Sequence, residues 1–555
     1  MAERTTVPGE VAAARAISSG ASLRTKVAVI GAGPTGAALA LGLGRQGVDT
    51  ILVDAHREPR RGVRAGGFTS RGMEVLRVLG VADDIRDRAA VRKGWPATSV
   101  VTTGLASGAL VAAPTGAPST VYAPAEIRQN VQAWVTEAVM REHIDTCPSV
   151  TTLYGREFAG DLRQHNDHVH LTVLDWFGNP SELRADYVVA ADGVNSIVRE
   201  VLGVPITGAR RFRVHHTIEF IAPGFGRAHA LGEHNQYQVY TDRMLAYFLH
   251  QDMGNRWTMQ IEEIDPNIAD LVLTDPVSII RMALGHDDVE IEWAAGRRWK
   301  ANAFWTSTQR VGRVFLAGDA AHPTPPGGLG VQLGLTDALD IAWKLGAVCR
   351  GWGGPKLLDS ITDERLPINR AVVQRVDTSP SLRHLAFVGL EGDALNEAVL
   401  ASVEARDRHR GDSNIISHGA VYRDSPVVVM DVESAPPAGL FSDNPCAELA
   451  KQIPHREVFG GRALLDLPGW GFALLVAEAE HAIKFEAAAQ RLGIPLSVAA
   501  IGSDVVAELV GHRRSCSILL RPDAFVAWMG DVSDVDPAYV LSTAAGQKAP
   551  AQVGG

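Results

Sequence analysis

Three glycines with the spacing Gly31-x-Gly33-x-x-Gly36 lie between an apolar run, KVAVIG, and a helix-like stretch, AALALGLGRQG. In a strand–turn–helix unit, Gly31 permits the tight turn, Gly33 lets a pyrophosphate approach the backbone, and Gly36 lets the helix pack closely on the strand. The free amides and the dipole at the start of such a helix bind phosphate. The segment therefore predicts a dinucleotide site, which also includes Pro34 and Thr35.

An acidic residue ends the next apolar run, VDTILVD: Asp54 follows Gly36 by 18 residues. A carboxylate near this position accepts hydrogen bonds from a ribose. The glycine spacing alone is weak evidence, but strand, turn, helix and acidic terminus together favour a dinucleotide over a purely structural glycine turn. The pattern does not separate a flavin from a nicotinamide cofactor.

Two later segments decide between these cofactors. In YVVAADGVNSIVR, Asp192 and Gly193 follow an apolar run, and in GRVFLAGDAAHPTPPGGLGVQLGLTDALDIAWKL, Gly318 and Asp319 do the same. Both segments resemble the aromatic-ring flavoprotein monooxygenases of the para-hydroxybenzoate hydroxylase type. The resemblance extends over residues 25–541, nearly the whole chain, and implies that the dinucleotide is FAD.

The resemblance also implies how the second segment holds FAD. The Asp319 carboxylate accepts a hydrogen bond from a ribityl hydroxyl, and the loop PTPPGG brings the backbone close to the flat flavin ring. The helix that begins near Gly330 points its amides at the ring, where a positive helix end stabilises the negative charge of the reduced flavin. The cofactor-binding residues implied here are Asp192, Asp319, Pro326, Gly328, Gly330 and Val331, with Pro325 beside the substrate.

Three further matches extend the resemblance. Arg64 matches an arginine that flanks the FAD pyrophosphate, and Gln129 matches a glutamine that contacts the cofactor, although a solvated arginine and a helix-surface glutamine are the plain alternatives. Glu364 and Arg365, with Pro367, match the ER-x-P element that closes the FAD domain, where a structural role is expected.

Two departures from the family pattern concern the flavin environment. Family members usually carry an asparagine two residues after the last glycine of the PGGxG loop, where this chain has the longer Gln332. The segment GFTSRG, around Phe68, is also atypical, so the resemblance does not determine ring mobility or the entry of the substrate.

The resemblance implies that NADPH or NADH reduces FAD, that oxygen adds to give a 4a-hydroperoxyflavin, and that one oxygen atom passes to a phenolic or polycyclic, polyketide-like aromatic substrate. The one other GxGxxG spacing, Gly42-x-Gly44-x-x-Gly47, lies inside the same helix-like stretch, so no second strand–GxGxxG–helix unit is present, as expected if the nicotinamide cofactor binds transiently on the flavin domain. A Baeyer–Villiger or epoxidising reaction on the same scaffold, and a flavin-dependent small-molecule binder without turnover, are the alternatives. Three aromatic residues of the middle region are substrate candidates, with ordinary core packing as the alternative: Tyr237, Tyr247 and Trp257.

The pattern of elements predicts a mixed α/β and α+β fold. Apolar residues that include Ile127 and Val131 predict an amphipathic helix over 126–140, and alternating runs over 211–263 predict antiparallel strands. The run RVFLAG then predicts another buried parallel strand of the first domain, so the Rossmann-like FAD domain is expected to be discontinuous. The expected order is a flexible extension (1–24), the first segment of the FAD domain (25–200), a substrate-binding sheet domain (201–300), the second segment of the FAD domain (301–395), a linker (396–437), a thioredoxin-like domain (438–545) and a tail (546–555).

The C-terminal region resembles the thioredoxin-like appendage of the longer family members, because LLRPDAFVAWMGD matches their last hairpin. It lacks the paired cysteines of a redox thioredoxin, so dimer contacts in a homodimer or scaffolding are the expected roles.

Composition excludes several other classes of protein. The 555 residues are 46% hydrophobic and 21% charged, which is typical of a folded globular chain. A net charge of −10 disfavours nucleic acid and anionic lipid as partners, and no apolar run is long enough to span a membrane. The four cysteines are far apart, which indicates neither a disulfide framework nor a metal site and suits a reducing cytoplasm. The triplet His165, His168 and His170 lacks the partners of a metal site.

Overall fold

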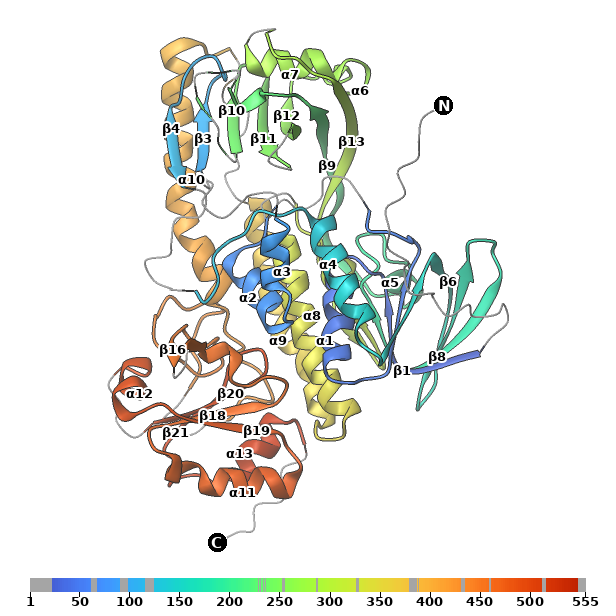
Figure 1. The fold of residues 1–555 in the computed structure, drawn as a ribbon, viewed down its shortest axis with the longest axis vertical. Coiled ribbons are helices and arrows are strands. Elements are labelled where there is room, and N and C mark those ends of the chain that lie inside the picture. Colours follow the sequence, from blue (N-terminus) through green and yellow to red (C-terminus); the bar gives the residue numbers. More distant parts are fainter. Residues whose placement is uncertain are drawn as a thin grey trace.

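A computed structural model describes residues 22–60, 67–89, 98–114, 124–227, 229, 231–232, 234, 236–251, 255–285, 288–325, 329–378, 387, 389–430, 435–458, 461–511 and 516–547 (Figure 1). The candidate cofactor residues Arg64, Pro326 and Gly328 lie outside these ranges.

The first body is built on an eight-stranded, largely parallel sheet with strand order β14-β15-β8-β1-β2-β5 and the β6–β7 hairpin beside β8. Its β15 follows the second sheet in sequence yet pairs in parallel with β8, as expected for a discontinuous domain. The carboxyl ends of β1, β2, β8 and β15 therefore meet at one edge. The strands are β1 Ser22–Ile30, β2 Thr50–Asp54, β5 Val150–Tyr154, β6 Arg156–Gln164, β7 Val169–Asp175, β8 Pro180–Ala190, β14 Arg310–Val311 and β15 Val314–Leu316.

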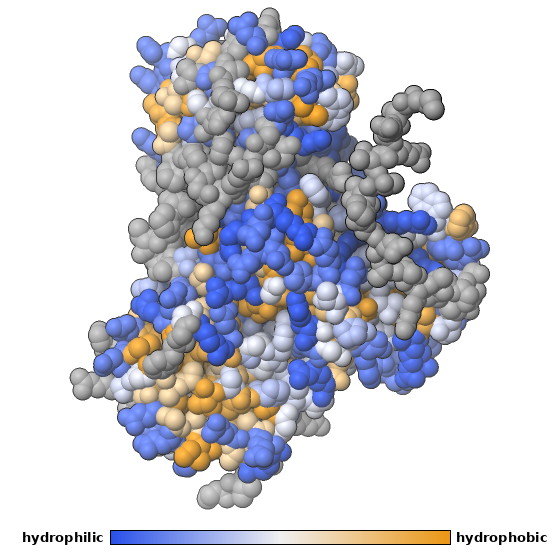
Figure 2. All heavy atoms as spheres, viewed as in Figure 1, coloured by the Kyte–Doolittle hydropathy of each residue, from blue (hydrophilic) through white to orange (hydrophobic). Residues whose placement is uncertain are grey.

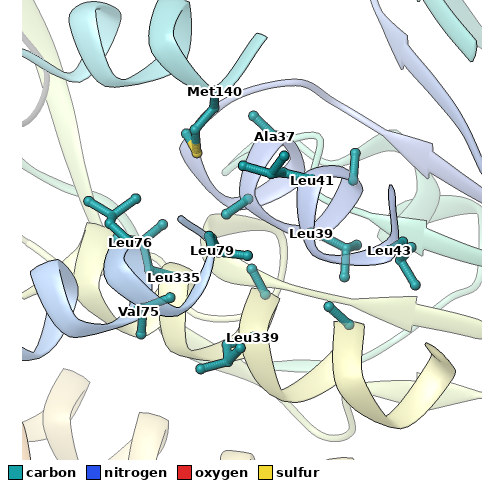
Figure 3. Close-up of a cluster of buried hydrophobic side chains, with 14 of the residues drawn as sticks. Ala37, Leu39, Leu41, Leu43, Val75, Leu76, Leu79, Met140, Leu335 and Leu339 are labelled. Atoms are coloured by element: carbon teal, nitrogen blue, oxygen red, sulfur yellow. The ribbon is translucent and has the colours of Figure 1, made fainter. Parts of the chain in front are cut away.

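Helices cover this sheet and share one apolar core. Figure 3 shows Ala37 and Leu41 of α1 on the side of Met140 of α4, and Leu39 and Leu43 on the opposite side of α1, in a cluster that also contains residues of α2 and α8. Small residues on α1 let the helices approach closely, as the run AALALGLG indicates. The helices of this body are α1 Pro34–Arg45, α2 Ser70–Val78, α3 Ala82–Asp87, α4 Ala133–Asp145, α5 Ile197–Val201, α8 Gly330–Cys349 and α9 Pro355–Thr378.

A second, seven-stranded sheet forms the upper body in Figure 1, with strand order β13-β9-β12-β11-β10-β3-β4. Helices α6 (Leu271–Thr274) and α7 (Pro276–Leu284) pack on one face, and α10 (Gly392–His418) packs on a portion of the other. The antiparallel strands expected over 211–263 are confirmed. The strands are β3 Thr98–Thr102, β4 Val111–Pro114, β9 Ile206–Ile221, β10 Gln236–Tyr240, β11 Met244–His250, β12 Arg256–Ile264 and β13 Trp293–Thr306.

Three expectations about elements differ from the structure. Strands β3 and β4 lie within 25–200, expected to belong to the FAD domain, yet they pair in the second sheet. The helix expected over 126–140 begins at Ala133, and Ile127 is 71% exposed. The expected linker over 396–437 contains most of α10, a largely polar helix whose apolar residues Leu395 and Val399 contact the second sheet.

The C-terminal body has a four-stranded sheet of order β19-β18-β20-β21, in which β18 and β19 are parallel and the other pairs antiparallel. The antiparallel β20–β21 pair agrees with the hairpin expected from LLRPDAFVAWMGD. Figure 2 shows hydrophobic residues grouped on the visible face of this body, whereas hydrophilic residues cover α2 and α3. The elements are β16 Glu457–Val458, β17 Arg462–Ala463, β18 Phe472–Val476, α11 Ile483–Leu492, β19 Leu496–Ala500, α12 Ser503–Leu509, β20 Ser517–Leu520, β21 Val526–Gly530 and α13 Pro537–Ala544.

Within the described residues, no helix is both long and apolar enough to cross a bilayer. No group of histidine, cysteine and carboxylate side chains in these ranges is arranged to hold a metal ion.

Candidate functional site

The glycine-rich turn follows β1 and opens α1. A Cβ placed on Gly36 would lie 1.8 Å from the Gly31 carbonyl oxygen, and one on Gly31, whose φ is +101°, would lie 2.3 Å from the Ala191 carbonyl oxygen. Both glycines are therefore required for close packing. A Cβ on Gly33 would meet no atom within 4 Å, so this side of the turn has room for a ligand. Together with the free amides of α1, this geometry fits a pyrophosphate.

Asp54 fixes the same turn from the end of β2. Its Oδ2 accepts a hydrogen bond of 2.6 Å from the Ala32 amide, and its Oδ1 accepts one of 2.7 Å from the His56 amide. The side chain is 13% exposed, so the carboxylate retains access to solvent and to a ribose hydroxyl. The residue thus serves the local fold as well as the expected ligand.

A buried carboxylate, that of Asp337, positions the Gly318–Asp319 turn at the end of β15. Asp337, in α8, accepts the Gly318 amide at 3.0 Å, and its Oδ2 lies 2.5 Å from His322 Nε2. Arg365 Nε donates to the other oxygen of Asp337 at 2.8 Å. Burial alone would raise the pKa of Asp337, but His322 and Arg365 hold that pKa well below its usual range.

This network orients the turn toward the sheet edge. Gly318 and Ala320 are buried, whereas Asp319 between them is exposed. Thr35 packs between this turn and α8. Its Oγ1 would lie 2.6 Å from a Cβ on Gly318 and 2.3 Å from a Cβ on Gly334, so both contacts need glycine. The sequence motifs do not single out Asp337, although a carboxylate inside the apolar run LGLTDALDIAWKL is a signal for a buried partner.

The Asp192–Gly193 segment lies beside this turn, because Arg199 joins the two motifs. The Arg199 guanidinium donates to the carbonyl oxygens of Ala320, at 2.8 Å, and Val194, at 3.0 Å. Asp192 Oδ2 accepts the Val198 amide at 3.3 Å, and its buried Oδ1 has no hydrogen-bond partner among the described residues. Burial raises the pKa of Asp192. An unsatisfied buried acceptor beside the turn suits a ligand hydroxyl.

Helix α8 begins at Gly330, next to Thr324 and the buried Pro325. Among the described residues no side chain caps its start, so its first amides can bind a ligand. Val331 is half-buried against the core shared with α1.

Gln332 stands where family members usually have asparagine, and its side chain packs against α2. Its Nε2 donates to the Gly67 carbonyl oxygen at 3.4 Å, and its Oε1 would lie 1.9 Å from a Cβ on Gly72. Only 5% of the residue is exposed. The longer amide therefore fastens the GFTSRG segment to α8.

Gln129 lies in an extended segment. Its backbone pairs with Phe68, with N–H···O distances of 2.7 and 3.0 Å, and the residue is 8% exposed. The residue therefore positions the atypical GFTSRG segment, and the helix-surface interpretation does not apply.

The three aromatic substrate candidates lie on opposite faces of the second sheet. Tyr237 and Trp257 are 0% and 2% exposed in the core under α6 and α7, and the Tyr237 hydroxyl donates to Gly232 and accepts from the His234 amide. Such packing explains both residues without a ligand. Tyr247 lies on the other face, in register with Gln238 and Gln260.

A buried charged cluster fastens the C-terminal body to α8 and α9. Arg521 is fully buried and donates to Glu364 at 2.6 and 2.8 Å and to Asp523 at 2.6 and 3.0 Å. Lys344 contacts Asp340 at 2.8 Å and Glu364 at 2.5 Å. Burial raises the pKa of Asp340 to about 7, whereas the two cations outweigh burial at Glu364 and lower its pKa to about 2.

Comparison with known proteins identifies this arrangement. Residues 24–376 match the family described as FAD binding domain. The chain is 30% identical to aklavinone 12-hydroxylase of Streptomyces purpurascens and 29% identical to tetracenomycin B2 monooxygenase-dioxygenase of Streptomyces olivaceus, each over 93% of this chain and 97% of the relative. The structure resembles that of the flavin-dependent monooxygenase PieE in complex with FAD and substrate, with a TM-score of 0.81, 25% identity, and coverage of 94% and 98% of the two chains.

The chain therefore belongs to the FAD-binding-domain family of flavin-dependent aromatic monooxygenases. A ternary complex of aklavinone-11 hydroxylase with FAD and aklavinone is a further structural neighbour, with a TM-score of 0.78, 26% identity, and coverage of 94% and 99% of the two chains. The resemblance seen in the sequence motifs, the FAD cofactor and the enzymatic class are thereby confirmed.

Proposed function

We propose that this protein uses NAD(P)H and oxygen to hydroxylate a phenolic or polycyclic, polyketide-like aromatic compound. The observation that carries the proposal is the similarity, over nearly the full length of both chains, to enzymes named for aklavinone and tetracenomycin B2. This similarity extends beyond the FAD domain, because it also includes the second sheet and the C-terminal body.

The residues at the sheet edge fit FAD, and each is assigned to a different part of the cofactor. Gly33 and the start of α1 would hold the pyrophosphate, Asp54 would bind a ribose and Asp319 the ribityl chain, and the first amides of α8 would act on the ring. FAD bound here supplies the redox chemistry, accepting a hydride from the nicotinamide and activating oxygen. The α8 amides stabilise negative charge on the reduced ring. Asp337 holds the Gly318–Asp319 turn so that the carboxylate of Asp319 is presented to the ligand.

We place the aromatic substrate on the face of the second sheet opposite α6 and α7. Register puts Tyr247 beside Gln238 and Gln260, and Gln260 beside Thr217, on this face. Tyr247 and Gln260 are partly exposed, so a phenol and an amide are available to the hydroxyl and carbonyl groups of an oxygenated aromatic compound, whereas Gln238 and Thr217 are buried and hydrogen-bonded within the sheet. The opposite face is filled by the core under α6 and α7, whereas on this face α10 covers the part around Tyr240 and Leu245, and Tyr247 lies beside that cluster.

We also propose that the C-terminal body is a thioredoxin-like domain with a scaffolding role. Its parallel β18–β19 pair and antiparallel β20 and β21 support that fold. Its cysteines, Cys446 and Cys516, are not in a disulfide. The insertion of Arg521 between α8 and α9 supports a role in holding the flavin-binding helices.

Turnover tests the proposal directly. The FAD-loaded protein is mixed anaerobically with NADPH across a panel of phenols, naphthoquinones and polycyclic polyketides, and flavin absorbance is followed by stopped flow. Flavin reduction that accelerates with one aromatic class, followed by a hydroxylated product when oxygen is admitted, is the expected result. A protein that cannot be loaded with FAD contradicts the proposal.

A further inference from the structure

A partly exposed tryptophan lies on the same face of the second sheet as the polar side chains assigned to the substrate. Trp299 belongs to β13, the edge strand beside β9 (Figure 1), and its Nε1–H donates to Thr217 Oγ1 of β9 at 3.1 Å. Thr217 pairs in register with Gln260. The next residue of β9, Ile218, points into the core under α6 and α7, because successive strand residues alternate between the two faces. Trp299, Thr217 and Gln260 therefore share the face opposite these helices.

Two contacts hold the indole of Trp299 in one orientation. The hydrogen bond to Thr217 fixes one edge, and the ring stacks on His215, with centroids 4.8 Å apart and planes 21° apart. Burial and the neighbouring Arg213 lower the pKa of His215 to about 4, so its imidazole is uncharged at neutral pH and packs as a flat ring. Trp299 itself is 38% exposed. A fixed, partly exposed indole is a stacking surface for a flat aromatic ring.

Strand register gives the distance from this indole to the phenol of Tyr247. Thr217 of β9 pairs with Gln260 of β12, and Gln260 pairs with Tyr247 of β11. Neighbouring strands lie about 4.8 Å apart, so two spacings separate Tyr247 from Thr217, which holds the indole, by about 10 Å. Gln260 and Tyr247 are both partly exposed. A single aromatic ring stacked on Trp299 is too short to reach Tyr247, whereas a planar skeleton of three or four fused rings spans the distance.

We propose that Trp299 is a specificity-determining residue that stacks on one end of a planar substrate of three or more fused rings, whose other end contacts Tyr247. The inference rests on the proposed function and narrows its substrate class, because a single-ring phenol cannot contact both residues at once. Gln260 lies between them, and its side-chain amide both donates and accepts hydrogen bonds, as a hydroxyl or carbonyl group on a middle ring requires.

Binding of compounds with one and with three rings tests this assignment. We would titrate the oxidised, FAD-loaded enzyme with resorcinol and with dihydroxyanthraquinone by isothermal titration calorimetry. The variants are Trp299→Ala, Trp299→Phe and Tyr247→Phe. Trp176→Ala is the matched control, because Trp176 is 76% exposed in the turn between β7 and β8. FAD content and melting temperature are recorded for each protein.

Trp299→Ala is expected to weaken the binding of dihydroxyanthraquinone about ten-fold, since loss of aromatic stacking has an effect of this order. Tyr247→Phe should also weaken this compound, whereas resorcinol should be weakened by one of the two changes at most. Trp299→Phe keeps a smaller ring without the hydrogen bond to Thr217, so its loss should lie between those of wild type and Trp299→Ala. This variant decides the test if Trp299→Ala does not fold. The control should match wild type.

Three results overturn the assignment of Trp299. They are dihydroxyanthraquinone affinities of both Trp299 variants within two-fold of wild type, an equal loss in Trp176→Ala, and a loss of resorcinol binding in both Trp299→Ala and Tyr247→Phe. A wild-type enzyme that hydroxylates single-ring phenols and binds no fused-ring compound also overturns it, although the proposed function then stands. Failure of the proposed function is distinct, because in that case the wild-type enzyme hydroxylates no aromatic compound.

Discussion

Replacement of Arg521 by methionine is the perturbation with the largest expected effect on the assembly of the three bodies. The guanidinium is fully buried and contacts Glu364, Asp523 and Asp340, the last at 3.3 Å. In its absence Lys344 is the one cation left in the cluster to face three carboxylates. The methionine preserves much of the aliphatic volume, so the change isolates the loss of charge.

The expected cost follows from burial. Removing one partner from a buried ion pair destabilises a protein by about 3–5 kcal/mol, because the remaining charge loses both its partner and its solvation. At about 1.4 kcal/mol per factor of ten, the equilibrium constant for separating the C-terminal body from α8 and α9 increases by about two to three and a half powers of ten. Glu364→Gln in the same chain removes one of the stranded carboxylates and is expected to restore some of this loss.

Hydrogen exchange followed by mass spectrometry, together with urea unfolding, measures this opening. Peptides from α9 and β20 should exchange faster in Arg521→Met, and less so in the double variant. Arg491→Met on the exposed surface of α11 serves as the matched control and should match wild type. Exchange and unfolding indistinguishable from wild type in Arg521→Met would refute the assignment of a stabilising role to the cluster.

Three further predictions concern single residues. Since burial raises the pKa of Asp340 from 3.8 to about 7, the folded protein holds a proton that the unfolded chain releases, and the free energy of unfolding contributed by this group falls as pH rises through that interval. Urea unfolding at several pH values should show a shallower fall in Asp340→Asn; an identical slope contradicts the assignment. Gly33→Ala has room in the fold but intrudes on the pyrophosphate, so isothermal titration should show FAD bound about ten-fold or more weakly while the melting temperature of the apoprotein is retained. If Gly33→Ala instead fails to fold, Gly33 has a structural role and the prediction is wrong. Tyr237→Phe should lower the free energy of unfolding in urea by about 1–3 kcal/mol without changing substrate affinity. Tyr247→Phe should weaken substrate binding without changing the free energy of unfolding. An equal effect of both variants on substrate binding would contradict the placement of the substrate.

The strand–turn–helix unit and its glycines were predictable from the sequence because their requirements are local. Gly31 and Gly36 are fixed by contacts within one turn and its neighbouring strand, and the spacing carries that information. The C-terminal strands and helix α11 were predictable for the same reason, since their apolar periods are short and uninterrupted.

Pairings across long distances in sequence were not predictable. Strand β3 pairs with β10 across an intervening domain segment, and nothing in TSVVT indicates which sheet it joins. Arg521 and Glu364 are in contact but lie 157 residues apart in sequence, so no local sequence pattern indicates the cluster. The apolar residues around Ile127 have helical spacing, yet the backbone pairing of Gln129 with Phe68 holds this segment extended.

The most direct test of the monooxygenase account is isotope labelling of the product. Turnover of the FAD-loaded enzyme with NADPH, an accepted aromatic substrate and ¹⁸O₂ should give a product that carries one ¹⁸O atom, with the other oxygen atom in water. Oxidation of NADPH that yields only hydrogen peroxide with every aromatic compound, or a product whose new oxygen comes from solvent, would contradict the account.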